Sequence, residues 1–165
     1  MNFLEKAMTH VLTSQHEEII EQILDMSGLP EEILEEIVEL LHDTMPGWNW
    51  VGIYFLSKSQ LVLGPFRGKP TEHTTIKVGS GVCGTAIEKN TNVIIDDVSK
   101  CDNYLACSQE TRSEIVVLIR HQGQVVAQFD VDSNLPEHFT PQDEQFLMEV
   151  AELAAPYCHN LIGKL

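Results

Sequence analysis

The chain has 165 residues, 43% of them hydrophobic, and a formal net charge of −15 at pH 7. This length and apolar content indicate a globular domain with a hydrophobic core and exclude an intrinsically disordered chain. The acidic charge argues against nucleic-acid binding and against binding to an anionic membrane, since both need a basic surface. No apolar run approaches the roughly 20 residues that a membrane-spanning helix needs.

The first ten residues include Glu5 and lack the basic and apolar regions of a secretory signal peptide. We therefore expect a cytoplasmic protein. Thiols in that compartment stay mostly reduced, so structural disulfides are not expected, whereas transient redox disulfides are.

Residues 1–47 predict two amphipathic helices that are rich in acidic side chains. The first is expected to begin at Ser14, because Glu17 follows three residues later as in a capping box. The second is expected between Pro30 and Gly47, where apolar residues recur at helical spacing. The acidic residues within both helices are expected to form solvated helix faces.

From Trp48 onward the apolar spacing changes from helical to alternating, which predicts strands. Strands are expected over 48–57, 60–66 and 92–96, with a hairpin over 113–133, a short helix over 84–90 and a final helix over 139–162. The final helix has Thr140 as its cap, Pro141 in first position and Asp143 three residues after the cap. This order predicts an α+β fold in a single domain over 1–165, with an antiparallel central sheet (48–165) and the N- and C-terminal helices packed on one side.

Two of the expected strands carry unusual side chains on the face that points away from the apolar core. Along 48–57, Trp50 and Tyr54 share a face opposite to the valine, isoleucine and phenylalanine side chains. Along 113–133, Asp130 and Asp132 likewise share the second face. If the sheet brings these strands together, the residues form a pocket with aromatic walls and an acidic floor. Alternatively, the aromatic rings pack beneath a helix and the aspartates form a solvated strand face.

The chain has four cysteines, Cys83, Cys101, Cys107 and Cys158. No CxxC pair is present, and the spacing of Cys101 and Cys107 is unusual for zinc, so no metal site is predicted. A hydrolase with Cys107 as nucleophile and His121 or His73 as base has no supporting motif. Cys158 lies on the apolar side of the final helix and is expected in the core. The other cysteines are either structural, as Cys83 can be as a small buried residue beside two glycines, or they form a redox couple.

Six motifs, in order, resemble free methionine-(R)-sulfoxide reductases, which are small enzymes with the GAF fold. They run from about Trp48 to Ala155 and read NWVGIYF, LVLGPFRGKP, GSGVCGTA, ACSQETRSEIVV, FDVDS and FTPQDEQFLMEVAELAA. The resemblance implies the GAF fold and reduction of the free R-sulfoxide of methionine by cysteine chemistry. It also implies that no cofactor is bound and that thioredoxin or a similar dithiol is the external reductant.

The resemblance further implies roles for the cysteines. Cys107 matches the nucleophile of the family's ACD motif, which becomes a sulfenic acid when it reduces the sulfoxide. Cys83 in GVCG matches a thiol that can then form a disulfide with it, and so act as the resolving thiol. Family members commonly read GKPAC, but this chain reads GKPTEH and has no thiol at Glu72 or its neighbours. The family aspartate after the nucleophile is Ser108 here. Cys101 falls where no family cysteine is expected, but it is a second candidate for the resolving thiol, because the five residues between it and Cys107 could close a disulfide ring.

The pocket residues also have family counterparts. Trp50 and Tyr54 match the residues that bound the substrate pocket, Glu114 matches the glutamate of SEIVV, and Asp130 and Asp132 match the acids of DIDS. Clustered carboxylates cannot all stay ionised, so one of them, which we expect to be Glu114 with Asp132 sharing the role, can protonate the sulfoxide oxygen. The others can bind the α-ammonium group, and the Trp50 ring offers a surface for the S-methyl group.

Two interpretations of a different class remain open. The chain could be a non-catalytic GAF module that binds a small molecule and has lost the usual resolving cysteine. It could also be an oligomerising module whose acidic N-terminal helices pack between subunits, and a homodimer is compatible with either interpretation.

Overall fold

The computed structural model describes the backbone of residues 3–102, 104–105 and 108–163, with side chains from residue 13 onward. In chain order the elements are α1 (Phe3–Asp25), α2 (Pro30–Thr44), β1 (Trp50–Ser57), β2 (Gln60–Arg67), β3 (Thr75–Lys77), α3 (Gly81–Lys89), β4 (Val93–Ile95), the 3-10 turn η1 (Val98–Lys100), β5 (Ser113–His121), β6 (Gln124–Ser133) and α4 (Pro141–Ile162). The strands form a six-stranded antiparallel sheet in the order β3-β2-β1-β6-β5-β4.

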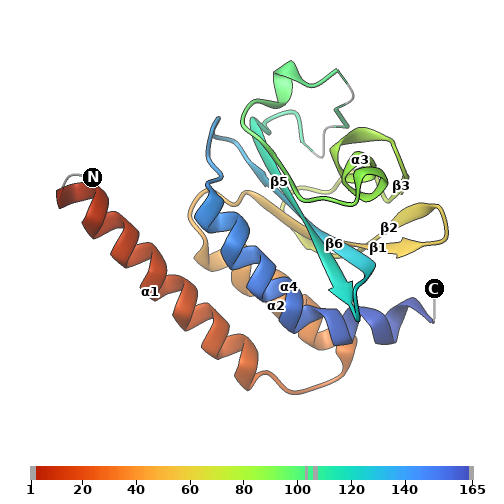
Figure 1. Ribbon diagram of the computed structural model, residues 1–165, viewed down its shortest axis with the longest axis horizontal. Helices are drawn as coiled ribbons and strands as arrows, with labels where there is room; N and C mark the ends of the chain where they lie inside the picture. The colour runs from red at the N-terminus through yellow and green to blue at the C-terminus, as the bar shows by residue number, and fades with distance from the viewer. Residues whose placement is uncertain (1–2, 103, 106–107, 164–165) are drawn as a thin grey trace.

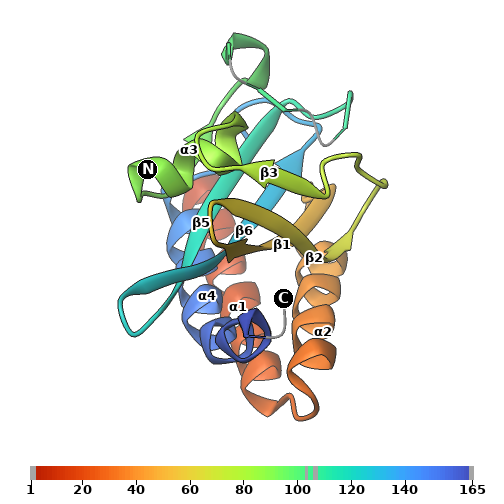
Figure 2. The same ribbon diagram turned by 90° about the vertical axis from the view of Figure 1, so that its right-hand side faces the viewer.

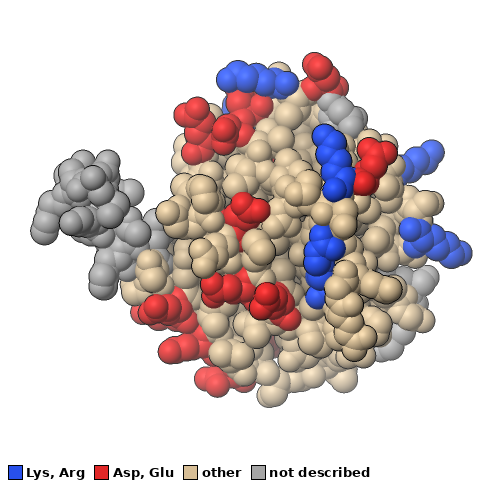
Figure 3. Space-filling model, in the orientation of Figure 1, with Lys and Arg blue, Asp and Glu red and all other residues tan. Residues whose placement is uncertain are grey.

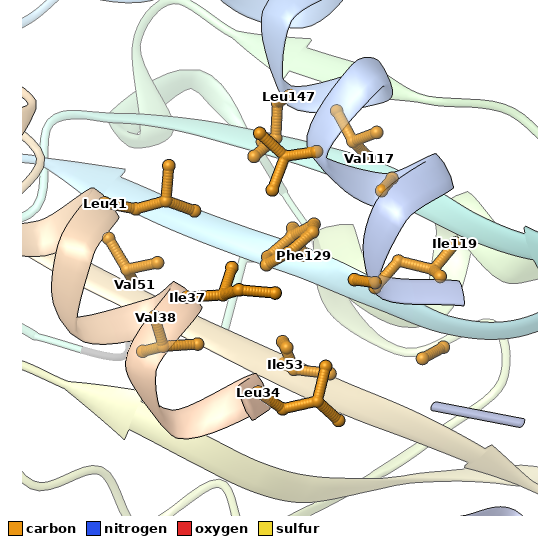
Figure 4. Packing of buried hydrophobic residues seen from close by; sticks show 14 of the residues in the cluster. Leu34, Ile37, Val38, Leu41, Val51, Ile53, Val117, Ile119, Phe129 and Leu147 are labelled. Carbon is orange, nitrogen blue, oxygen red and sulfur yellow. The ribbon is translucent and has the colours of Figure 1, made fainter. Parts of the chain in front are cut away.

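Helices cover both faces of the sheet, but unequally (Figure 1 and Figure 2). On one face α2 packs against β1 and β2, and α4 packs against β5 and β6, while α1 lies outside them against α4. The larger hydrophobic core fills the space between these helices and the sheet, with Ile37, Ile53, Phe129 and Leu147 fully buried in it (Figure 4). On the opposite face α3 covers a smaller buried cluster. The expected α+β fold, with the N- and C-terminal helices on one side, is confirmed.

The structure differs most from the sequence-based expectation in three places. The first helix begins at Phe3 and not at Ser14, because the intervening residues include strong helix formers such as leucine, glutamate, lysine and alanine, which extend the helix past the expected cap. Strand β3 was not expected, because three residues are too few to show alternation. The short helix α3 begins at Gly81, three residues before the expected start.

The ends of the two helices that pack on the sheet agree with the sequence. Helix α2 begins at Pro30. Helix α4 begins with a capping box in which the Thr140 hydroxyl accepts a hydrogen bond from the Asp143 backbone N–H, and the Asp143 carboxylate accepts one from the Thr140 backbone N–H. These caps satisfy amide groups that the first helical turn leaves without partners, and so fix where α4 starts on the sheet.

The acidic side chains of α2 lie on a solvated surface, as the helix pattern predicts. Along α2 the glutamates are exposed, while the side chains between them are buried against the sheet. Figure 3 shows Asp and Glu side chains distributed over one face of the molecule, with fewer Lys and Arg among them. None of the helices that the structure describes combines the length and apolarity needed to cross a bilayer.

Candidate active site

The register of three neighbouring strands brings the expected site residues together on the sheet face that α3 covers. Trp50 in β1 lies opposite Asp132 in β6, and Asp132 lies opposite Glu114 in β5. Two residues further along β1, Gly52 lies opposite Asp130. Because side chains alternate along a strand, all these residues point away from the larger core. The aromatic face of β1 and the acidic face of β6 are therefore one continuous surface.

Trp50 and Tyr54 form an aromatic wall that is bound to the loop between β2 and β3. The Trp50 indole stacks on Phe66 with ring centroids 5.6 Å apart, and the Trp50 and Tyr54 ring centroids are 6.3 Å apart. Trp50 Nε1 donates a hydrogen bond to the Lys69 carbonyl at 3.0 Å, and the Tyr54 hydroxyl donates one to the His73 carbonyl at 2.7 Å. The two aromatic side chains thus bind main-chain carbonyl groups at both ends of this loop.

Gly52 provides the space that the indole of Trp50 occupies. A Cβ atom placed on Gly52 would lie 2.3 Å from Cη2 of Trp50, a separation that real Cβ atoms do not show. A larger residue at position 52 would therefore displace the ring. The alternation of apolar residues in β1 predicts which face Gly52 occupies, but not that the neighbouring indole folds over it.

The three carboxyl groups are buried and interact with one another. Glu114 is 4% exposed, Asp132 1% and Asp130 0%, so the alternative of a solvated strand face is wrong. Burial raises the pKa of Glu114 well above its ordinary value, and the nearby charges of Asp130 and Asp132 and a hydrogen bond with Asp130 raise it further. Glu114 therefore tends to keep its proton and can act as an acid.

Cys83 of α3 lies beside this acidic cluster. The Cys83 sulfur and the carboxylate oxygens of Glu114 and Asp130 lie within 4.8 Å of one another. A thiolate with two carboxylates is also a donor set that a zinc ion accepts. Cys101 is half-exposed, and its charge contributes to the raised pKa of Glu114. Both candidate resolving thiols thus lie near the same acid.

The predicted nucleophile Cys107 lies outside the described residues, but residues on both sides of it are placed. Leu105 packs against Gly81 at the start of α3, where a Cβ on Gly81 would lie 2.9 Å from the leucine side chain. Ser108 lines a cavity that is also lined by Trp50 and Asp132. The chain on each side of Cys107 therefore approaches the acidic and aromatic face.

Cys158 lies in α4 and is fully buried in the larger core, as expected. Burial raises the pKa of its thiol to about 12, so it stays protonated and unreactive at neutral pH.

The cavity beside Trp50 has a volume of about 290 Å³. Its lining includes Trp50, Lys69, Ser108, Glu110, Thr111 and Asp132. Sequence reasoning singled out Trp50 and Asp132 but missed Lys69, Glu110 and Thr111. All three lie within quoted motifs, LVLGPFRGKP and ACSQETRSEIVV, but sequence reasoning gave them no role, because the two loops lie far apart in the sequence and only the fold brings them together.

Comparison with known proteins identifies the family. The GAF domain family model matches residues 29–156. The chain is 42% identical to free methionine-R-sulfoxide reductase of Escherichia coli (strain K12) over 115 residues, which cover 69% of each chain. The chain belongs to the free methionine-R-sulfoxide reductases.

Two solved structures of this family of oxidoreductases resemble the chain. A type II free methionine-R-sulfoxide reductase from Thermoplasma acidophilum is 37% identical, with a TM-score of 0.77, covering 79% of this chain and 93% of that one. The enzyme from Neisseria meningitidis in complex with its substrate is 30% identical, with a TM-score of 0.79, covering 91% of this chain and 89% of that one. The sequence-based resemblance to free methionine-R-sulfoxide reductases is thus confirmed.

Changing Gly52 to alanine is expected to disturb the Trp50 ring in this family member. The added methyl group overlaps the indole, and overpacking of this kind costs about 1–3 kcal/mol. We expect a shifted tryptophan emission spectrum and a lower free energy of unfolding by urea. Gly163→Ala is the matched control, because no atom of the described residues beyond its chain neighbours lies within 4 Å of its added Cβ. An emission spectrum that is unchanged in Gly52→Ala would contradict the close contact.

Changing Glu114 to glutamine is expected to stabilise the fold at neutral pH. Because the pKa of Glu114 is higher in the folded than in the unfolded state, the wild type loses stability as pH rises above the ordinary glutamate pKa of 4.5. Glutamine removes this loss, so the variant is expected to be more stable by about 1–3 kcal/mol at pH 7.5, and the gain is expected to shrink as pH falls towards 4.5.

Urea unfolding at several pH values measures this difference. The exposed Glu72→Gln variant controls for loss of a carboxylate at the surface. A gain in stability that does not depend on pH, or a loss at pH 7.5, would contradict the raised pKa of Glu114.

Proposed function

We propose that this chain reduces the free R-sulfoxide of methionine to methionine, with Cys107 as the nucleophile. The observation that supports this most is a buried carboxyl group with a raised pKa, Glu114, on the same sheet face as the Trp50 indole and the Asp132 carboxylate. Ser108, the residue after Cys107 in the sequence, lines the cavity next to Trp50 and Asp132. The Escherichia coli relative bears the name of this activity.

In the first step, the thiolate of Cys107 attacks the sulfur of the sulfoxide while Glu114 gives a proton to the sulfoxide oxygen. The oxygen then passes to the cysteine sulfur, so that a thiol and a sulfoxide become a sulfenic acid and a thioether. The cysteine sulfur is oxidised by two electrons and the methionine sulfur is reduced by two. Trp50 contacts the S-methyl group, with Tyr54 behind it in the same wall.

The aspartates bind the other end of the substrate. Asp130 and Asp132 lie on adjacent positions of one strand face, so together they can pair with the α-ammonium group of a free amino acid. A methionine sulfoxide within a peptide has no such ammonium group, unless it is the N-terminal residue. This requirement favours the free amino acid over a protein side chain as the substrate.

In the second step, the sulfenic acid of Cys107 condenses with a second thiol, which yields a disulfide and releases water. We assign this resolving role to Cys83, since its sulfur lies beside the Glu114 and Asp130 carboxyl groups. Cys101 is the alternative: it lines a cavity of about 320 Å³ together with Gly81 and Val82, next to Cys83 in α3.

Thioredoxin or a similar dithiol then reduces the disulfide. All electrons in this cycle come from thiols, so it needs no bound cofactor. The cytoplasmic location, the single-domain organisation over 1–165 and the homodimer remain predictions.

The change Cys107→Ser is expected to abolish reduction. The assay measures methionine formed from the free R- and S-sulfoxides, with dithiothreitol or thioredoxin as reductant. Only the R-sulfoxide is expected to react with the wild type, and peptide-bound sulfoxide is expected to be inert. Cys158→Ala controls for loss of a thiol, because Cys158 lies in the opposite core. Unchanged turnover in Cys107→Ser would refute the mechanism, and sulfoxide binding without reduction by the wild type would favour a sensor module.

The resolving thiol is identified by separating the first turnover from later ones. Cys83→Ser is expected to release about one methionine per chain, as the wild type does in its first turnover, and then to stall with thioredoxin. Cys101→Ser is expected to sustain thioredoxin-driven turnover. The opposite outcome for these two variants assigns the resolving role to Cys101.

A further inference from the structure

An ion pair lies across the cavity beside Trp50 and has no role in the mechanism described above. Lys69 Nζ, from the loop after β2, lies 2.6 Å from Glu110 Oε1, from the loop before β5. Both residues line the cavity, and Asp132 lies in the same lining. Among the lining residues that the structure describes, Lys69 is the one cation. The cavity thus presents a positive group and a buried negative group to a single ligand.

Thr111 adds a second polar group to this cavity. Its side chain is 2% exposed, and within the described part of the chain its hydroxyl has no hydrogen-bond partner. Buried hydroxyl groups nearly always have a partner, so a buried one that lines a cavity indicates a ligand or a water molecule as its partner. Thr111 follows Glu110 directly, so this hydroxyl lies next to the ion pair in the sequence and shares its cavity.

The main chain of Lys69 is held against the aromatic wall. Trp50 Nε1 donates a hydrogen bond to the Lys69 carbonyl, and a Cβ on the preceding Gly68 would lie 2.7 Å from Cδ1 of Trp50. The Lys69 side chain therefore extends from a main-chain position that is fixed at the edge of the indole. A ligand whose methyl group lies on the Trp50 ring has its other end within the reach of this side chain.

A free amino acid matches these groups, because it carries an ammonium and a carboxylate on the same carbon atom. We infer that Lys69 and Thr111 bind the α-carboxylate of the substrate. In the absence of substrate the Glu110 carboxylate pairs with the Lys69 ammonium group, and the substrate carboxylate replaces it. This inference rests on the proposed function and extends it to a specificity site. The ammonium pairs with Asp132 at the buried side of the same cavity.

Glu110 resembles the substrate carboxylate in its contacts. One of its oxygens binds the Lys69 ammonium at 2.6 Å, and the other accepts a long hydrogen bond from Asn134 Nδ2 at 3.5 Å. The Glu110 side chain is exposed, so the ion pair exchanges easily for another carboxylate. A methionine sulfoxide within a peptide has an amide in place of this carboxylate, unless it is the C-terminal residue, so it cannot replace Glu110. The site thereby selects a free carboxyl group.

The test compares free methionine-(R)-sulfoxide with its carboxamide, in which a neutral amide replaces the carboxylate. Lys69→Met is expected to raise the KM for the free acid by roughly tenfold to a hundredfold, which is the usual effect of losing a hydrogen bond to a charged group. Little change is expected in kcat or in the KM for the carboxamide. The preference of the wild type for the acid is therefore expected to disappear.

Two further variants examine the other groups. Thr111→Val is expected to raise the KM for the free acid, and Thr111→Ser to restore most of the affinity. Glu110→Gln is expected to lower the KM by up to about fivefold, since it removes a competing carboxylate from an exposed ion pair. Matched controls are Lys77→Met, an exposed lysine of β3, and Glu39→Gln, which breaks the exposed Arg67–Glu39 pair.

The outcomes separate this inference from the proposed function. An equal loss of affinity for the acid and the carboxamide in Lys69→Met, or an unchanged KM for the acid, would overturn the role of Lys69. A higher KM in Glu110→Gln would overturn the competition by Glu110.

If the wild type reduces neither sulfoxide, the proposed function fails, but binding still tests the inference. Tryptophan fluorescence is then titrated with free methionine and with methioninamide. Loss of the preference for methionine in Lys69→Met supports the inference, and an unchanged preference overturns it.

Discussion

The pairing of β1 with β6 places the aromatic and acidic side chains of the candidate site side by side. In this register Trp50 lies opposite Asp132 and Gly52 lies opposite Asp130, while the alternate residues Val51, Ile53, Phe129 and Val131 face the helices. Since side chains alternate along both strands, a slip of one residue would turn the carboxylates into the apolar core and the core residues out of it. The large energetic cost of that exchange makes the register unique. The packing of α2 and α4 on one face thus specifies the chemistry on the other.

The two faces of the sheet divide stability and reactivity between them. The helix-covered face buries the larger apolar cluster and supplies most of the hydrophobic stabilisation. The α3-covered face buries three carboxyl groups close together, an arrangement that destabilises the fold but holds a proton on Glu114. Strained or charged sites of this kind persist where the rest of the structure compensates for them. The same burial that raises the pKa of Glu114 therefore depends on a core that lies across the sheet from it.

Local patterns were sufficient for most of the fold and for the deep part of the site. Alternation along 48–57 and 113–133 predicted both faces of β1 and β6, and the cap at Thr140 predicted the start of α4. The three-residue strand β3 carries no local signal strong enough to reveal it. The helix formers that extend α1 to Phe3 do favour a helix, but the capping pattern at Ser14 pointed to a later start. The ion pair of Lys69 and Glu110 joins loops 41 residues apart, and only tertiary packing brings them together. The Lys69–Glu110 side of the cavity was therefore missed, although its acidic and aromatic residues, Asp132 and Trp50, were predicted.

The hydrogen bonds from Trp50 and Tyr54 to the loop after β2 have a consequence for how this enzyme can diverge. Both rings hold carbonyl groups, those of Lys69 and His73, and no side chain of the loop takes part in either bond. Any amino acid supplies the same carbonyl, so the exposed Glu72 between these anchors can be exchanged without shifting the aromatic wall, whereas the Thr71 hydroxyl accepts a hydrogen bond from the His73 backbone N–H. A lineage can therefore gain or lose a thiol in this loop, and with it a site for disulfide formation, while the cavity beside Trp50 keeps its shape.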